Sequence, residues 1–227
     1  LDSLLESTGV EWIRPMYMYP SGVTRELLRF IHQSGGRILP YIDVPLQHAH
    51  PDILRTMGRP FVGDPRRVVD RIRSELPHAC LRTSLIVGYP GETDQHFRSM
   101  LALVQEAKFW HLGVFCFSPE EGTAAHRLPG QVPEEIKEQR REELMQVQAE
   151  ISKEAMSQWV GQRIQVLVDA PEPEWPGLFR GRTWFQAPEV DGISYVSSLQ
   201  ARPGDMVWAE VVESMTYDLS TLAVEED

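Results

Sequence analysis

Hydrophobic residues in the first 158 positions follow two kinds of spacing. Short apolar runs with the length of buried strands alternate with segments in which apolar residues recur every three or four positions, as on one face of a helix. The runs predicted as strands are 12–19, 38–46, 81–87 and 112–117, and the predicted helices cover 1–8, 23–34, 64–76, 93–107 and the residues after 133. A helix followed by four strand–helix pairs predicts parallel strands with right-handed crossovers. About four strands cannot close a barrel, so they form a small open sheet or an arc of a larger barrel.

Local signals mark several of the helix ends. Asp64-Pro65 is a cap followed by a first-turn proline, and Thr93 begins the helix after the third strand. Gly35-Gly36 ends the helix after the first strand. These signals agree with the apolar periodicity and fix the order of the elements.

The pattern changes after Gly161, where short strands and turns replace the strand–helix alternation. Asp191-Gly192 and Pro203-Gly204-Asp205 are turn signals between the short strands. Several short strands at close spacing predict a small β-barrel. We place the boundary near Trp159, which gives domains at 1–158 and 159–227. The predicted strands of the second domain are 164–168, 178–185, 193–196, 206–212 and 220–224.

Charge is distributed unevenly along the chain, which has a net charge of −11. Residues 159–227 hold 4 basic and 12 acidic residues, whereas residues 1–158 hold 18 and 21. An acidic barrel repels a phosphate backbone unless its arginines cluster, and it attracts basic partners. The apolar share of 42% is that of a folded protein.

Composition also indicates the compartment. No apolar run approaches the roughly 20 residues that span a bilayer, and the first ten residues show no signal peptide. Cys80 and Cys116 form neither a metal motif nor a disulfide framework. A reducing cytoplasm is therefore the predicted location.

Candidate chemistry lies directly after the predicted strands. Residues 84–92 read Ser-Leu-Ile-Val-Gly-Tyr-Pro-Gly-Glu, 43–49 read Asp-Val-Pro-Leu-Gln-His-Ala, and 117–123 read Phe-Ser-Pro-Glu-Glu-Gly-Thr. Met57-Gly-Arg59 follows the second of these. Parallel α/β folds bind ligands at the carboxyl ends of their strands, so these segments are the predicted site.

In this order and spacing, the segments resemble a radical S-adenosylmethionine (radical SAM) methylthiotransferase, and the tail resembles the TRAM domain that ends such enzymes. The segment 186–192, Gln-Ala-Pro-Glu-Val-Asp-Gly, resembles the RimO branch, which methylthiolates the β-carbon of an aspartate in a small-subunit ribosomal protein. The sister branch, MiaB, acts on an adenosine in tRNA. The resemblance implies an α/β fold: a partial (β/α) TIM-like radical SAM barrel followed by a small OB-like TRAM barrel.

The family pattern includes parts that this sequence lacks. Such transferases hold a [4Fe-4S] cluster through a Cys-x3-Cys-x2-Cys run, and an amino-terminal domain with three more cysteines holds a second cluster. Cys80 and Cys116 cannot replace six thiolates. We therefore interpret the chain as a carboxyl-terminal fragment of an S-adenosylmethionine enzyme with two clusters. The fragment alone is expected to bind no cofactor or metal and to be inactive, with no catalytic residue of its own.

The resemblance assigns cofactor-binding roles to eight residues, which would lie along the adenine, the ribose or the methionine end of S-adenosylmethionine. They are Gln47, His48, Arg59, Ile86, Gly88, Glu92, Ser118 and Thr123. Ile86 and His48 could equally be structural core residues. Arg59 could cap a helix end, Glu92 could favour a helix amino terminus, and Ser118 and Thr123 could form turns. His48-Ala49-His50 resembles a metal pair, but without a third ligand it predicts no site.

The tail has a predicted docking face that would suit a basic ribosomal protein. It comprises Trp184, Phe185, Glu189, Asp191 and Tyr195. Alternatively, the aromatics fill the barrel core. Two other hypotheses remain open. A tRNA-modifying enzyme would gather its barrel arginines on one face, and a non-catalytic binding module would have no turnover. The arginines in question are Arg163, Arg180, Arg182 and Arg202.

Overall fold

The computed structural model describes residues 1–59 and 64–224. The chain divides into two compact units, Leu1–Gln148 and Ala149–Asp227. The long helix α6, Glu134–Ser157, begins in the first unit and ends in the second. The predicted domain boundary at 158/159 stays a prediction. None of the helices in the described ranges is both long enough and apolar enough to cross a membrane.

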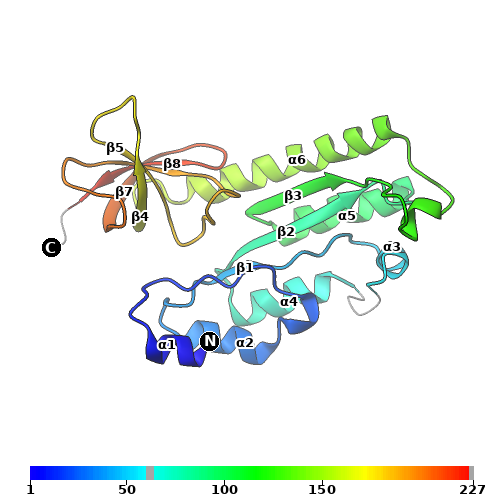
Figure 1. The fold of residues 1–227 in the computed structure, drawn as a ribbon, viewed down its shortest axis with the longest axis horizontal. Coiled ribbons are helices and arrows are strands. Elements are labelled where there is room, and N and C mark those ends of the chain that lie inside the picture. The colour runs from blue at the N-terminus through cyan, green and yellow to red at the C-terminus, as the bar shows by residue number, and fades with distance from the viewer. Residues whose placement is uncertain (60–63, 225–227) are drawn as a thin grey trace. The chain divides into compact units, whose positions relative to one another are not determined.

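The first unit is built around a parallel sheet, as the sequence predicts (Figure 1). In the described residues the sheet has three strands in the order β1-β2-β3, and both pairings are parallel. Its strands are β1 (Tyr41–Asp43), β2 (Cys80–Val87) and β3 (His111–Cys116). Its helices are α1 (Asp2–Ser7), α2 (Arg25–Gln33), α3 (Pro51–Thr56), α4 (Arg66–Glu75), α5 (Asp94–Ala107) and the first part of α6, with short 3-10 turns at Pro20–Gly22 and Ala125–Arg127.

The predicted strand at 12–19 is wrong. Only Ile13 forms a bridge, parallel to Ile38, and the backbone then departs from extended geometry because Tyr17 has a φ of 55°. Pro15 also removes a backbone donor that a strand would need. The segment still borders the sheet, since the Met18 amide donates to the Asp43 carbonyl at 2.8 Å.

The second predicted strand, 38–46, is shortened to Tyr41–Asp43. Pro40 and Pro45 flank it, and a proline cannot donate to the ladder. Helix α3 is not among the predicted elements. Its signal is Pro51, which occupies the first helical turn after His50, whose ring accepts the Asp52 amide as the N-cap.

Apolar helix faces cover the sheet and form the core of the first unit. Leu28 and Ile31 of α2 are buried, as are Val68, Val69 and Ile72 of α4. Thr24 caps α2 by accepting the Leu27 amide at 3.1 Å, which places that buried face at the expected register. The predicted periodicity of these helices is therefore confirmed.

The second unit contains a closed five-stranded barrel in the order β4-β5-β6-β8-β7, which confirms the small β-barrel predicted from the tail (Figure 1). All pairings are antiparallel except β6 with β8. Alternate residues such as Ile164, Val166 and Val168 point into its core. The strands are β4 (Arg163–Pro171), β5 (Leu178–Arg182), β6 (Ser194–Ser197), β7 (Met206–Ser214) and β8 (Leu219–Ala223).

Candidate functional site

The segments that follow the three parallel strands converge at one edge of the sheet. Gln47 bridges to Leu85, its amide donates to the Ser84 carbonyl at 2.8 Å, and its carbonyl accepts the Ile86 amide at 2.7 Å. On the other side of β2, the Phe117 amide donates to the Val87 carbonyl at 2.9 Å. The ends of β1, β2 and β3 therefore meet where the sequence places its candidate site. Ligand binding at that edge stays a prediction.

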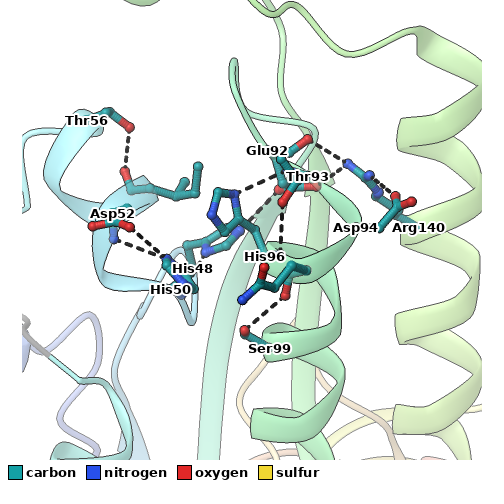
Figure 2. A network of polar contacts seen from close by, with 12 residues as sticks. His48, His50, Asp52, Thr56, Glu92, Thr93, Asp94, His96, Ser99 and Arg140 are labelled. Carbon is teal, nitrogen blue, oxygen red and sulfur yellow. Dashed lines mark hydrogen bonds and ion pairs between the residues drawn. The ribbon is translucent and has the colours of Figure 1, made fainter.

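A buried chain of polar groups underlies this edge (Figure 2). The His50 amide donates to Nδ1 of His48 at 2.9 Å, so Nε2 of His48 carries its proton and donates to Oε2 of Glu92 at 3.2 Å. Nη1 of Arg140 donates to Oε1 of Glu92 at 2.7 Å, and its Nη2 donates to Oδ1 of Asp94 at 2.7 Å. The His48 and Glu92 side chains are fully buried. The buried carboxylate is thus balanced by one guanidinium and one neutral imidazole.

These contacts define what His48 and Glu92 do within the chain. Both oxygens of Glu92 accept hydrogen bonds from protein groups, and both nitrogens of His48 have protein partners. The two residues therefore join the end of β1 to the start of α5 and to α6. Their predicted contact with a cofactor stays a prediction. An effect of His48 and Glu92 on a bound cofactor would be indirect, because these side chains hold the neighbouring backbone in position.

Arg140 and Lys137 are central residues that sequence reasoning missed. They lie on the inner face of α6 together with Leu144 and Gln148, and all four are buried. The available signal was their spacing of three and four residues along an otherwise charged helix. The spacing was not recognised as a buried face because lysine and arginine are rarely buried unless they are paired.

Lys137 also explains the glycine at position 88. Gly88 has a φ of +73°, and a Cβ there would lie 2.2 Å from Cγ of Lys137. The Lys137 ammonium donates to the Phe117 carbonyl at 2.8 Å and pairs with Glu134 at 2.9 Å. The space at Gly88 is therefore filled by protein. Gly91 has a φ of +84° and no heavy atom within 4 Å of its Cβ position, while its amide donates to the Gly130 carbonyl at 2.9 Å.

Three predicted residues offer partly exposed surface near the strand ends. Gln47 is half-buried and has a φ of 70°, a conformation that non-glycine residues seldom adopt outside functional or tightly determined positions. Ile86 is half-buried on β2. Arg59 is half-buried just after α3, and its amide donates to the Leu54 carbonyl at 2.7 Å.

Ser118 and Thr123 lie on the exposed loop after β3, and both contact Glu120. The Ser118 hydroxyl donates to Oε1 of Glu120 at 3.0 Å, and the Thr123 hydroxyl donates to the Glu120 carbonyl at 2.8 Å. Thr123 Oγ1 also accepts the His126 amide at 3.3 Å. These are turn-forming contacts, and both hydroxyls remain at the surface of the loop.

The predicted docking face divides into buried and exposed residues. Phe185 has no exposed surface, stacks on Trp159 at 5.2 Å between ring centroids, and meets Trp184 edge-to-face at 5.3 Å. Phe185 therefore packs inside the second unit, as in the alternative interpretation, whereas Trp184 is half-buried. Tyr195 is half-buried on β6.

The acidic residues of that face also differ from each other. Glu189 is exposed and has a φ of 67°. Oδ2 of Asp191 accepts the Ala187 amide at 2.8 Å, so Asp191 shapes the turn. Glu189 is therefore the more accessible carboxylate of the pair.

Two of the barrel arginines are paired with acids on neighbouring strands and loops. Arg180 pairs with Glu172 at 3.2 Å, and Arg182 forms an ion pair with Asp169. Arg163 stands opposite Glu210 in the β4–β7 register. Neutralised arginines make a weak phosphate-binding surface.

The chain's own thiols do not fit an iron–sulfur cluster. Cys80 is buried in β2, and Cys116 lies at the end of β3. Burial and the nearby Glu138 raise the pKa of the Cys116 thiol, which disfavours the thiolate that iron requires. At the carboxyl edge, no heavy atom lies within 4 Å of the Cβ position of Gly91, so that side of the backbone is open, and binding of S-adenosylmethionine there stays a prediction.

Comparison with known proteins shows what the chain is similar to. The radical SAM superfamily model matches residues 3–104 and the TRAM domain model matches residues 160–224. Over 98% of its length the chain is 58% identical to the ribosomal protein uS12 methylthiotransferase RimO of Nitratidesulfovibrio vulgaris, and 55% identical to that of Oleidesulfovibrio alaskensis. These matches cover 52% of each relative, so the chain spans about half the length of the curated relatives it matches.

A solved structure also matches. Coproporphyrinogen III oxidase (HemN) from Escherichia coli, a radical SAM enzyme, aligns with a TM-score of 0.48 and 18% identity over 62% of this chain and 32% of that chain. The sequence matches confirm the predicted relation to RimO-type proteins and the TRAM domain of the tail. Residues 3–104 of this chain therefore match the radical SAM superfamily model, residues 160–224 match the TRAM domain model, and the chain is similar over 98% of its length to RimO methylthiotransferases.

Proposed function

We propose that this chain is part of a radical SAM methylthiotransferase that modifies the β-carbon of an aspartate in a basic small-subunit ribosomal protein. The similarity to proteins named uS12 methylthiotransferase supports this proposal. The observation that carries it is the meeting of the β1, β2 and β3 ends at one edge, with Gln47 hydrogen-bonded to β2 and Phe117 bonded to its other side. A cytoplasmic location follows from a ribosomal substrate.

The proposed cofactor site occupies the accessible part of this edge. Gln47, Ile86 and Arg59 provide partly exposed groups, while Ser118 and Thr123 lie on the covering loop. Arg59 would pair with the methionine carboxylate through a bidentate contact. When bound, S-adenosylmethionine beside a cluster supplies the radical chemistry, and this chain contributes binding and orientation. We assign the ligands of both [4Fe-4S] clusters of the intact enzyme to residues other than Cys80 and Cys116.

The predicted buried residues would act through position. His48, Glu92 and Gly88 are enclosed by protein groups, so their proposed contribution is to hold the backbone of residues 86–91 in place. A fixed backbone at a strand end keeps donors and acceptors oriented toward a ligand without reorganisation on binding.

The proposed cofactor site can be tested in the intact methylthiotransferase that contains this chain. Arg59→Gln removes the proposed carboxylate partner and should raise KM for S-adenosylmethionine by roughly 10- to 100-fold, the range for a lost charge-assisted hydrogen bond. Arg67→Gln is the matched control, because Arg67 is an exposed arginine on α4. Equal KM values for both variants would contradict the assignment of Arg59.

The proposed substrate surface is the acidic barrel. Its net charge is negative, and Arg180 and Arg182 are held by carboxylates, which favours a protein rich in lysine and arginine over tRNA. Glu189 is the exposed acid of the predicted docking face. The tRNA alternative gains no support from arginines that are already paired with acids.

A binding experiment separates the two substrate classes. Calorimetry with the 227-residue chain should detect binding to ribosomal protein uS12 that weakens as salt rises, and none to tRNA. Glu189→Gln should weaken the binding several-fold, whereas Glu213→Gln, at an exposed acid on β7, should not. Binding of tRNA without binding of the protein would refute the substrate proposal, and it would leave the cofactor site to be judged by Arg59.

A further inference from the structure

Three side chains with metal-binding donors meet where α3 and α5 begin. His50 is the N-cap of α3, Asp52 lies in the first turn of α3, and His96 lies in the first turn of α5. One donor atom from each lies within 4.8 Å of the others. The His50 and His96 rings are in contact, with centroids 4.3 Å apart. Figure 2 shows the His50 and His96 side chains near the buried His48, and the two ring planes are tilted by 47°.

The donors are in states that suit a cation. Oδ1 of Asp52 accepts from Arg55 at 2.8 Å, while its Oδ2 lies 3.8 Å from Nδ1 of His50 and faces the rings. The hydrogen bond from Arg55 lowers the pKa of Asp52 and keeps it ionised. Nδ1 of His50 accepts the Asp52 amide and Nδ1 of His96 accepts the Thr93 amide, so each ring carries a lone pair there. A neutral imidazole is the form that binds metals.

We propose that His50, Asp52 and His96 form a binding site for a divalent transition-metal ion, of which Zn²⁺ is the representative. Two imidazoles and one carboxylate are a common ligand set for such ions, with water in the remaining position. The ion would join the beginning of α3 to the beginning of α5. This site rests on these three side chains and does not depend on the proposed reaction.

Binding has a local cost, because both rings already serve as helix caps. The Asp52 amide donates to Nδ1 of His50 at 3.3 Å, and the Thr93 amide donates to Nδ1 of His96 at 3.2 Å. An ion bound to Nδ1 displaces the backbone amide from that nitrogen. An ion bound to Nε2 shifts the ring proton to Nδ1, which can then no longer accept. In either case the Asp52 and Thr93 amides lose their acceptors. Bonds this long are weak, and the loss of each lowers the affinity by roughly 2- to 10-fold. Coordination by three protein ligands outweighs that penalty.

A second group of donors in the described residues lacks these properties. Cys116, Glu134 and Glu138 also lie within 4.8 Å of one another. Both carboxylates pair with cations on α6, as Asp52 does with Arg55, so the thiol in place of imidazoles is what distinguishes this group. The raised pKa of the Cys116 thiol keeps it protonated, so this group is a useful negative control.

The test is calorimetric titration of the chelator-treated 227-residue chain with ZnCl₂, with Co²⁺ as a spectroscopic probe of coordination. Wild type should bind one ion. His50→Asn and His96→Gln replace the ligands while retaining side chains that cap helices at these positions, so folding is preserved. Each should weaken binding by at least roughly 100-fold, the upper end of what loss of an outer-shell partner causes.

Controls distinguish the site from adventitious binding. His78→Asn, at an exposed histidine, and Cys116→Ser should each leave the affinity within about 2-fold of wild type. Arg55→Gln removes a nearby cation and should tighten binding several-fold. The proposal is overturned if wild type binds no Zn²⁺ at millimolar concentration, or if His50→Asn and His96→Gln bind it as wild type does.

Discussion

Replacing Arg140 with methionine would leave the Glu92 carboxylate inside the protein without its guanidinium partner. The Glu92 side chain is fully buried and that of Arg140 is 8% exposed, and Nη1 of Arg140 lies 2.7 Å from Oε1 of Glu92. Removal of one partner from a buried ion pair costs about 3–5 kcal/mol, because the remaining charge is desolvated without compensation. We therefore expect Arg140→Met to destabilise the first unit by that amount.

A double-mutant cycle measures how much of this effect belongs to the pair. Glu92→Gln keeps an oxygen that can accept from His48, so it should cost only about 1–3 kcal/mol. With the charge of Glu92 removed, Arg140→Met should cost less than it does in the wild-type background. The two substitutions should then deviate from additivity by about 1–3 kcal/mol.

Urea unfolding followed by far-ultraviolet circular dichroism is the assay, since α1 to α5 all belong to the first unit. Arg141→Met is the matched control on the same helix. Arg141 pairs with Glu138 at 2.7 Å, but both side chains are more than 40% exposed, so its loss should cost at most about 1 kcal/mol. Equal destabilisation by Arg140→Met and Arg141→Met would refute the argument, because it would mean that Glu92 is hydrated or has another partner.

Three further predictions concern other parts of the chain. The pKa of His96 is lowered in the folded state, so the unfolded chain binds the proton more strongly. The contribution of His96 to the free energy of unfolding should therefore be fully present above about pH 6.5 and be lost as the pH falls. His96→Gln should flatten this pH dependence in urea titrations. Gly88→Ala should lower the free energy of unfolding by about 2–4 kcal/mol, and Gly91→Ala by about 1 kcal/mol. Both glycines have a positive φ, but only at Gly88 does the Lys137 side chain occupy the Cβ position. Similar losses for the two variants in urea unfolding would contradict this. Phe185→Ala should destabilise the barrel by about 3–5 kcal/mol as measured by hydrogen exchange of its strands, and unchanged protection there would show that the ring is not part of the core.

The order of the elements could be predicted from the sequence because periodicity is a local property. Apolar residues at helical spacing identified α2, α4 and α5, and short strands between turns identified the barrel. Errors arose where backbone chemistry opposed an apolar pattern. Residues 12–19 are apolar enough for a strand, but Pro15 and the positive φ of Tyr17 limit their pairing to the bridge at Ile13.

The position of the candidate site could be predicted from the sequence, but the hydrogen bonds and side-chain contacts within it could not. Parallel strands bring their carboxyl ends together, so the placement of Gln47 and Phe117 beside β2 follows from the topology. No local pattern indicates that the Lys137 side chain occupies the space beside Gly88, or that the His48 ring forms a hydrogen bond with the Glu92 carboxylate. These facts depend on which side chains of α6 face the sheet.

Sequence by itself thus determined the order of most helices and strands, the two architectures and the uneven charge, since each depends on neighbouring residues or on composition. Tertiary structure alone decided that Arg140 neutralises Glu92, that Arg180 is paired with an acid, and that His50 meets His96. The physical reason is that burial and charge pairing are set by residues distant in the chain. Their partners are fixed only when helices and strands pack.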